Sequence, residues 1–292
     1  MQPMPNFRFT FLTAHEMSLL RQTFLDAFAD YVVPIQLSET QFQTKLKREG
    51  IAPEFCVAAY VGDEMAGFIL TGLGEWEGKP TAYNAGTGVK PMYRGHRLTE
   101  QLYAFLLPKL RESGVEQCLL EVIQDNKPAL KSYERTGMRI TRSLDCFRSP
   151  KQEILFSTDM PDDITLSLAS RPDWKVYDTF KDVAPTWQNN SAAIKRSGSE
   201  CVTLEAVNSF EEVVGVISFF PKLGTVAQLA VDARWRDIGV GSALLREAVQ
   251  RTEASALLFI NIDHTAKEFI TFLERRHFKV ILRQYEMLMA IV

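Results

Sequence analysis

The sequence of 292 residues is poor in cysteine and histidine, has no large excess of charge of one sign and contains no long apolar run. Because the cysteines are scattered and form no C-x-x-C pair, we expect free thiols in a reducing compartment rather than a disulfide framework. The histidines are equally scattered, so no metal site is expected. These residues are Cys56, Cys118, Cys146 and Cys201, and His15, His96, His264 and His277.

The charge and the apolar runs exclude further classes of protein. The formal net charge of -3 argues against nucleic acid as the main partner. No apolar run is long enough to cross a bilayer, and the first residues lack the pattern of a signal peptide. We therefore expect a cytoplasmic protein with no nucleic-acid or membrane partner. A hydrophobic content of 46% over this length is typical of two folded domains.

The sequence contains one element twice. Residues 88–99 and 230–241 each follow an apolar strand, pass through a short basic turn and start a helix. Val89 and Arg94 match Val231 and Arg236 at one offset, 236 − 94 = 142. A strand that leads through such a turn into a helix directs backbone N–H groups and a helix N-terminus at one point, which suits an anion such as a pyrophosphate.

The periodicity predicts the same order of elements in both halves. A small deletion after the repeated turn shortens the offset between the halves to 278 − 138 = 140. Proline and aspartate interrupt the pattern between the halves, which predicts domains at 1–150 and 174–292 with a linker at 151–173. The fold class expected is α/β (α+β), two tandem domains, each a mostly antiparallel mixed sheet flanked by helices. The expected helices cover residues 14–31, 98–111, 128–135 and 268–275, with another around 240–249, and the expected strands cover residues 55–60, 65–71, 79–89, 118–123, 140–147, 202–207, 213–219, 225–231, 257–262 and 285–291.

These motifs resemble those of the GNAT N-acetyltransferase superfamily, which binds acetyl-coenzyme A. The turn Arg236-Asp237-Ile238-Gly239-Val240-Gly241 resembles the family's R/Q-x-x-G-x-G/A signature. In the first half, Asn126, Ala129, Tyr133 and Gly137-Met138 resemble its N-x-x-A-x-x-x-Y-x-x-x-G-F segment. The resemblance covers both halves and implies a tandem GNAT protein. It also implies acetyl-CoA as the acyl donor, an amine as the acceptor and no metal.

The resemblance implies a set of coenzyme-binding residues in each half. Main-chain groups of the strand before the turn would contact the pantetheine arm, and loop amides would contact the pyrophosphate, where glycine allows close approach. Carried over residue by residue, the set is Thr87, Val89, Arg94, Gly95, Arg97, Thr99 and Asn126 in the first half, and Leu229, Val231, Arg236, Gly239, Gly241 and Ser242 in the second.

Each half departs from the family pattern at a different element. In the first half the glycine positions hold Arg97 and Thr99, where Arg97 either obstructs the loop or reaches a coenzyme phosphate. In the second half the loop is intact, but Leu273 and Ala266 replace the residues that match Tyr133 and Asn126.

Acetyl transfer to an amine requires a neutral amine, an oxyanion donor and a proton for the departing thiolate. By resemblance, Tyr133 is the general acid and the backbone N–H of Val89 the oxyanion donor. Against this, Tyr133 fits equally well as part of the buried face of a short helix.

Glu121 is the candidate base, although a carboxylate within an apolar strand more often pairs with a cation. Asp26, Asp30, Glu75 and Glu77 are alternative bases, and Trp76 and Tyr83 are candidate pocket residues. Neither His264 nor His277 fits a relay with a carboxylate that spacing reveals.

The expected function is an acetyl-CoA-dependent N-acetyltransferase that acts on a primary amine of a small molecule by direct attack in a ternary complex. Tyr133, which Leu273 replaces in the second half, favours catalysis in the first domain. The glycines Gly239 and Gly241, whose places are taken by Arg97 and Thr99 in the first half, favour catalysis in the second domain. We favour the first arrangement at this point. A non-catalytic coenzyme A binding or sensing protein is the alternative. An aminoacyl-tRNA-dependent peptidyltransferase is disfavoured by the intact loop and the acidic net charge. The acceptor and the oligomeric state do not follow from the sequence.

Overall fold

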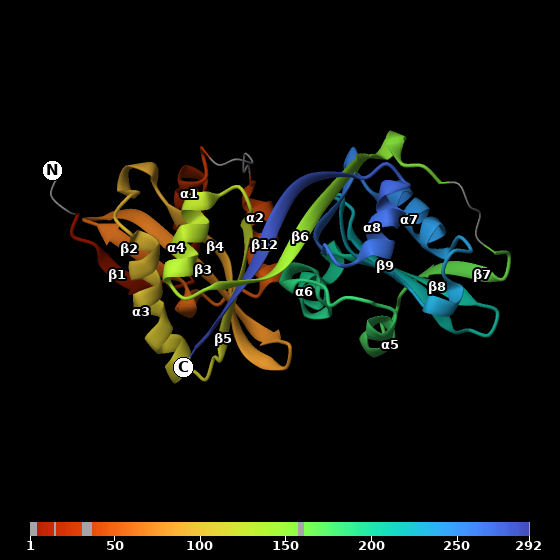
Figure 1. Ribbon diagram of the computed structural model, residues 1–292, viewed down its shortest axis with the longest axis horizontal. Coiled ribbons are helices and arrows are strands. Elements are labelled where there is room, and N and C mark those ends of the chain that lie inside the picture. Colours follow the sequence, from red (N-terminus) through yellow and green to blue (C-terminus); the bar gives the residue numbers. More distant parts are fainter. Residues whose placement is uncertain (1–4, 15, 31–36, 157–160, 292) are drawn as a thin grey trace. The chain divides into compact units, whose positions relative to one another are not determined.

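The computed structural model describes residues 5–14, 16–30, 37–156 and 161–291. The chain divides into two compact units (Figure 1). Unit 1 comprises Met1–Arg142 together with Tyr285–Val292, and unit 2 comprises Ser143–Gln284. The predicted bounds, 1–150 and 174–292, follow the sequence repeat, whereas the contacts assign the end of the last strand, from Tyr285 onward, to the first unit.

Unit 1 is a sheet in the order β1-β2-β3-β4-β5-β12, flanked by four helices. Its elements are β1 (Arg8–Phe11), α1 (Glu16–Ala27), α2 (Glu39–Glu49), β2 (Val57–Val61), β3 (Glu64–Trp76), β4 (Lys79–Val89), α3 (Leu98–Glu112), β5 (Gln117–Ile123), α4 (Lys127–Arg135), the start of β6 (Arg139–Pro150) and the end of β12 (Lys279–Ala290).

Unit 2 is a sheet in the order β6-β11-β10-β9-β8-β7, also flanked by four helices. Its further elements are β7 (Ile164–Leu168), α5 (Trp174–Thr179), α6 (Ser191–Ser197), β8 (Val202–Asn208), β9 (Val213–Phe220), β10 (Thr225–Val231), α7 (Val240–Arg251), β11 (Ala256–Asp263) and α8 (Lys267–Glu274). Short 3₁₀ helices cover Pro53–Phe55, Pro91–Tyr93, Lys151–Glu153, Trp187–Asn189, Gly198–Glu200 and Ala233–Trp235.

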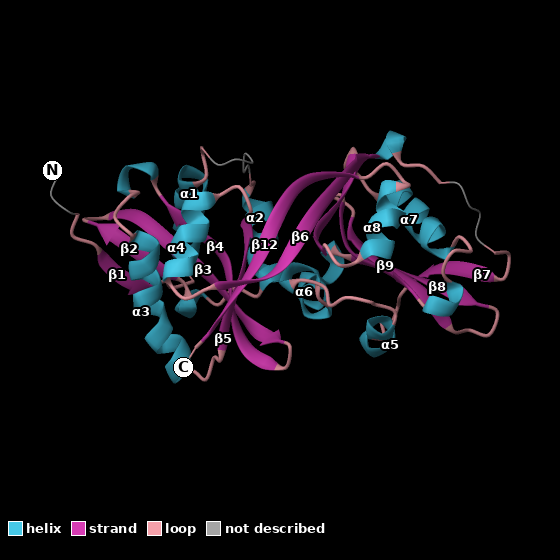
Figure 2. Cartoon of the chain, viewed as in Figure 1, coloured by secondary structure: helices cyan, strands magenta, loops and turns pink. Residues whose placement is uncertain are grey.

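The expected fold class is confirmed, because each unit is a mostly antiparallel mixed sheet with helices (Figure 2). The strands expected at 79–89 and 225–231 have the bounds predicted. The helix expected at 14–31 is α1, which ends at Ala27, while residues 15 and 31 lie outside the described residues. Five elements were not predicted, namely β1, α2, α5, α6 and β7, the last of which lies within the expected linker and pairs with β8.

The helices pack in equivalent ways in the two units. In unit 1, α3 and α4 contribute Leu102, Leu106 and Leu130 to an apolar cluster on one face of the sheet, and α1 and α2 cover the other face. In unit 2, α7 and α8 contribute Leu244 and Leu273 to the corresponding cluster. None of the helices in the described part of the chain is long and apolar enough to cross a membrane.

Each unit has a parallel strand pair that is hydrogen-bonded at one end and diverges at the other. In unit 2, β10 pairs with β11 at Thr225 and Val226, and a bulge follows between Val226 and Gln228 in its pairing with β9. In unit 1, β4 pairs with β5 over Thr81–Tyr83. Because β4 and β10 continue beyond this pairing, main-chain groups of their second halves are available to a ligand.

We predict that the end of β12, from Tyr285 onward, stabilises unit 1 rather than unit 2. Met287 on β12 is fully buried in the cluster beneath α3 and α4. Met287→Ala would lower the free energy of unfolding of unit 1 by roughly 2–5 kcal/mol. Hydrogen exchange should therefore accelerate in α3 and β5. Equal acceleration in α7 and β10 would contradict this assignment.

Candidate functional site

The loop before α7 keeps a conformation that exposes main-chain donors. Asp237 and Gly239 have φ values of 63° and 103°, so both lie in the left-handed region. No side chain caps α7, and the backbone N–H groups of residues 240–242 donate to no acceptor within the described residues. A Cβ at Gly241 would lie 3.2 Å from Cε2 of Phe272. The loop therefore presents unpaired amides, as an anion site requires.

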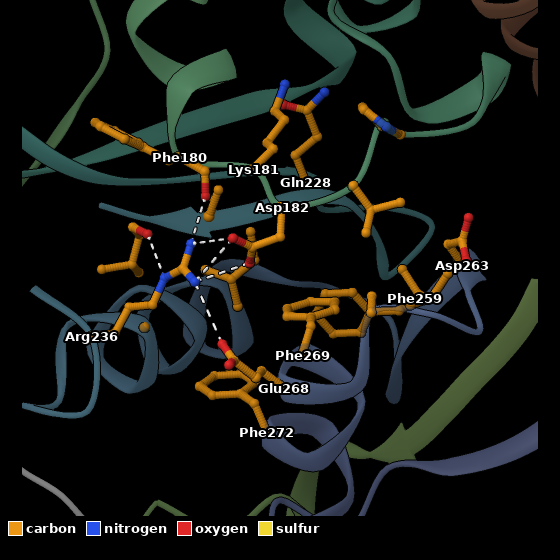
Figure 3. A pocket seen from close by; sticks show the side chains of 18 of the residues that line it. Phe180, Lys181, Asp182, Gln228, Arg236, Phe259, Asp263, Glu268, Phe269 and Phe272 are labelled. Carbon is orange, nitrogen blue, oxygen red and sulfur yellow. Dashed lines mark hydrogen bonds and ion pairs between the residues drawn. The ribbon is translucent and has the colours of Figure 1, made fainter. Parts of the chain in front are cut away.

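This loop opens onto a cavity of about 750 Å³, a size typical of small-molecule sites (Figure 3). Its walls come from the segment after α5, the diverging strands β10 and β11, the loop and α8. The cavity brings together all six residues that the resemblance selected in the second half, which are Leu229, Val231, Arg236, Gly239, Gly241 and Ser242.

Arg236 fixes three segments of the cavity wall to one another (Figure 3). Its Nε donates to the carbonyl oxygen of Val231 at 3.0 Å, and its Nη2 donates to that of Phe180 at 3.0 Å. Its Nη1 lies 2.9 Å from Oδ2 of Asp182 and 3.6 Å from Oε2 of Glu268. The guanidinium therefore holds the loop against the end of β10 and the segment after α5.

Arg94 makes the same contacts in unit 1. Its Nε donates to the carbonyl oxygen of Val89 at 3.2 Å, its Nη2 to that of Ala27 at 2.9 Å, and both terminal nitrogens bind Asp30. This ion pair lowers the pKa of the Asp30 carboxyl and raises that of Arg94. Both arginines therefore connect the loop to the strand end and to a segment on the other face of the sheet, and their expected contact with the coenzyme stays a prediction.

The two strand ends direct equivalent N–H groups toward the divergence. In unit 2, the N–H of Asp232 donates to the carbonyl oxygen of Val214 on β9, and in unit 1 that of Lys90 donates to Ala66 on β3. Since successive N–H groups of a strand point to opposite sides, those of Val231 and Val89 point away from these neighbours. Both N–H groups therefore face the side on which the parallel strands diverge.

The loop of unit 1 differs from that of unit 2 in its surroundings. Gly95 and Arg97 have positive φ values of 83° and 53°, and Arg97 takes the place of Gly239 before the helix. The Arg97 side chain is exposed. A cavity of about 480 Å³ lies beside the first turns of α3 and is lined by Gly95, His96, Arg97, Glu100, Gln101 and Ala104. Thr87 accepts a hydrogen bond from Asn84 at 2.7 Å.

Tyr133 and Asn126 both have structural contacts. Tyr133 is buried, and its ring packs edge-on against Tyr103 with centroids 6.4 Å apart. The Asn126 side chain accepts from the N–H of Ala129 and so caps α4. Ala266, at the equivalent position of unit 2, offers no such cap to α8.

Glu121 lies on the opposite face of β5 from the residues that pack with Tyr133. Its neighbours Leu120 and Val122 belong to the cluster that contains Tyr133, so alternation directs Glu121 to the other side. There its Oε2 accepts a hydrogen bond from the Tyr83 hydroxyl at 2.5 Å, and its Oε1 is buried without a partner in the described part of the chain. Burial raises the pKa of the Glu121 carboxyl to about 8.

The other candidate bases of the first half lie apart from Glu121. Asp26 lies 3.4 Å from Nζ of Lys90, and Asp30 binds Arg94. Glu75 and Glu77 are exposed at the β3–β4 hairpin. Trp76 is buried, and the Arg142 guanidinium lies over its ring at 5.3 Å.

The structure supplies two polar contacts that the sequence analysis did not find. Spacing in the sequence indicates no carboxylate partner for His264, but its Nδ1 lies 2.8 Å from Oδ2 of the buried Asp145. Arg276 donates from Nη2 to Oγ of Ser242 at 2.5 Å, and its buried Nε has no partner among the described residues. No local pattern predicts either contact, because the partners are 119 and 34 residues apart.

No group of three or more metal-ligating side chains occurs in the part of the chain that the structure describes.

We predict that Glu121 makes stability fall as pH rises. Its pKa is higher in the folded state than in the unfolded state, so the folded protein binds more protons between pH values of about 4.5 and 8. Glu121→Gln should remove this dependence, with a difference of roughly 3 kcal/mol between about pH 5.5 and pH 8 in urea unfolding. An unchanged slope in Glu121→Gln would contradict the raised pKa.

Comparisons with known proteins agree with the duplicated architecture. The fold matches that of a GCN5-related N-acetyltransferase from Sphaerobacter thermophilus with a TM-score of 0.74 and 18% identity, over 98% of this chain and 96% of that one. It matches a tandem GNAT protein from the clavulanic acid biosynthesis pathway with a TM-score of 0.73 and 14% identity, over 98% and 99% of the two chains. A GCN5-related N-acetyltransferase from Anabaena variabilis gives 0.62 and 14%, over 98% and 73%.

At these identities the structural matches show the fold alone. No curated protein was found to match the sequence. The sequence model of the acetyltransferase (GNAT) family, in contrast, matches residues 18–138 and 167–278, which together make up more than half of the chain. The chain therefore belongs to the GNAT acetyltransferase family, as a member with two tandem GNAT-like units.

Proposed function

We propose that the protein is an acetyl-CoA-dependent N-acetyltransferase that acetylates a primary amine of a small molecule, and that the reaction occurs in unit 2. The observation that carries this proposal is the cavity of about 750 Å³, into which β10, the loop and α7 direct all six residues selected from the second half. It replaces our sequence-based preference for the first domain as the site of the reaction.

The residues of the cavity fit the phosphate groups of coenzyme A. The unpaired amides of residues 240–242 and the N-terminus of α7 favour an anion. Arg276 adds a positive charge beside Ser242, to whose Oγ its Nη2 donates. The phosphates would therefore lie at this end, with the pantetheine arm along Leu229–Val231.

For this reaction the protein needs mainly to position the two reactants and to stabilise the charge that develops on the carbonyl oxygen. The neutral amine attacks the thioester carbonyl in the ternary complex, the carbon–nitrogen bond forms and the carbon–sulfur bond breaks. The N–H of Val231 stabilises the oxyanion. A thiol has a pKa of about 8.5, so the sulfur can leave as a thiolate and the amine proton can pass to water. Leu273 in place of the family's tyrosine is therefore compatible with turnover.

We predict that Gly239→Glu abolishes acetyl-CoA binding to unit 2. The glutamate would have to adopt a φ of 103° and would place a carboxylate beside the phosphates. Calorimetric titration should show a loss of affinity of about 100-fold or more.

The matched substitution Arg97→Glu, at the equivalent position of unit 1, should leave this binding in place. Loss of binding in Arg97→Glu, but not in Gly239→Glu, would assign the coenzyme to unit 1. Binding that Gly239→Glu abolishes, with no consumption of acetyl-CoA across a broad panel of amines, would favour a non-catalytic coenzyme sensor.

A second arrangement places the reaction in unit 1, with Tyr133 as general acid, Val89 as oxyanion donor and Glu121 as base. The observation that favours it is the tyrosine itself, because the hydroxyl that Tyr133 carries has no counterpart on Leu273. Glu121, with its raised pKa, would act from the other face of the sheet.

Tyr133→Phe distinguishes the two arrangements. If unit 2 is the active unit, kcat should change by less than about threefold, because the ring and its packing remain. General acid catalysis by Tyr133 would instead make kcat fall by about 100-fold or more, with acetyl-CoA affinity unchanged.

A further inference from the structure

Asn261 lies at the end of the cavity where β11 leaves β10. It follows Phe259, the last residue of β11 that pairs with β10, by two positions. It also lies within the bulge that β11 forms in its pairing with β6, and its φ of 57° is in the left-handed region that asparagine tolerates. Phe259 and Asp263, which precede and follow Asn261 in β11, lie on the side of the cavity away from Arg236 (Figure 3).

The two ends of the Asn261 side-chain amide have different surroundings. Its Oδ1 accepts hydrogen bonds from Nε2 of Gln284 on β12 at 2.6 Å and from Sγ of Cys146 on β6 at 3.5 Å. These contacts fix Oδ1 as the acceptor end of the amide. The donor end, Nδ2, is therefore the end directed away from Gln284.

The Nδ2 group of Asn261 is free to bind a ligand. It donates to no acceptor within the described residues, and unlike Oε1 of Gln228 and Nε of Arg276 it is not buried from solvent. Asn261 lines the cavity, so this accessible N–H group faces the space that a ligand would occupy. A ligand that displaces water from this site loses free energy unless it pairs the N–H with an acceptor atom of its own.

The part of a ligand that reaches Asn261 lies beyond the thioester. In the proposed reaction the phosphates lie at residues 240–242 and the thioester at the N–H of Val231, which is five positions after Val226, the last residue of β10 that pairs with β11. Asn261 is only two positions after its own last paired residue. The two places are therefore three positions apart, or roughly 10 Å at the usual rise of a strand. With the coenzyme on the phosphate side of Val231, the space near Asn261 is left for the acceptor.

On this basis, which rests on the proposed function, we propose that Nδ2 of Asn261 donates a hydrogen bond to a neutral oxygen of the acceptor, such as an ether, hydroxyl or carbonyl oxygen, at the end of the molecule remote from its amine. A neutral oxygen fits this end of the cavity because the Asp263 carboxylate lies there and disfavours an anion. The ammonium group of Lys181, which also lines the cavity, is bound by Asp178.

This recognition belongs to unit 2 alone. The residue equivalent to Asn261 in unit 1 is Glu121, at the offset 261 − 121 = 140, and its carboxyl is paired with Tyr83. Asn261 takes no part in proton transfer. Its role is to select among amines by the group that they carry far from the reacting nitrogen.

Conjugates of coenzyme A test the proposal without a known acceptor. In each conjugate the sulfur carries a CH₂–CO–NH linkage in place of the acetyl group and the amine, followed by a methylene chain of graded length. The chain ends either in a methyl ketone, whose oxygen only accepts hydrogen bonds, or in an isopropyl group of similar shape. At the length that reaches Asn261, the unmodified protein should bind the ketone about fivefold more tightly than the isopropyl conjugate in calorimetric titration. A conjugate that ends in a carboxylate should bind no more tightly than the ketone.

Asn261→Asp removes the donor and keeps the shape of the side chain. Aspartate tolerates the left-handed region and retains an oxygen for Gln284. This variant should lose the preference for the ketone and keep its affinity for coenzyme A itself within about twofold. Asn261→Gly, which accepts a positive φ without strain and adds no charge, should do the same. Asn6→Asp makes the same exchange at an exposed asparagine and should behave as the unmodified protein.

Four outcomes would overturn the assignment. They are an unmodified protein without the preference at any chain length, an Asn261→Gly protein that keeps the preference, a carboxylate conjugate that binds more tightly than the ketone, and Asn261 variants with weakened affinity for coenzyme A itself. The last would mean that Nδ2 serves a carbonyl group of the pantetheine arm. An unmodified protein that binds no coenzyme A would instead contradict the proposed function.

Discussion

The divergence of one parallel strand pair in each unit is the constraint on which the site depends. Paired strands satisfy their main-chain groups with each other, so a ligand has access to those groups only where the pairing stops. In unit 2 this occurs after Val226, where the bulge in β10 also brings Gln228 to the cavity. The arginine that follows each strand then holds the open end in place. Arg236 and Arg94 bind the carbonyl oxygen of the strand end and a segment from the opposite face of the sheet, so the loop cannot close onto the neighbouring strand.

The order of the elements and the conformation of the loop before α7 could be predicted because both depend on local sequence. Strands at 79–89 and 225–231 follow from apolar residues that end at a basic turn, and Gly239 marks a left-handed residue before a helix. Helix α2 was missed because Phe42 is its only buried apolar residue. A local signal was present, since Ser38 and Gln41 form a capping box and Gly50 ends the helix.

The remaining features depend on contacts between residues distant in the sequence. The repeat predicts a final strand in each half, but it does not reveal that Met287 completes the core of unit 1. The pair of Asp145 and His264 exists because β6 pairs with β11. The unpaired Oε1 of Gln228 follows from the main-chain oxygen of Asn189, whose position depends on the fold of the segment after α5. Such contacts cannot be predicted from residue type and spacing.

The two units show that a duplicated site can retain its framework while its contents diverge. The arginine contacts and the direction of the Val89 and Val231 amides are the same in both, so the main-chain geometry has been kept. The side chains around this main-chain framework differ between the two units. Unit 1 has a buried Tyr83–Glu121 pair and a tyrosine packed against Tyr103, whereas unit 2 has phenylalanines, Arg276 and Gln228 around an open cavity. Because the proposed contacts to pantetheine and to the oxyanion come from main-chain groups alone, side chains of the second unit can change without loss of these contacts. In the proposed reaction, the residues that differ between the units, rather than those they share, would therefore determine which amine is accepted.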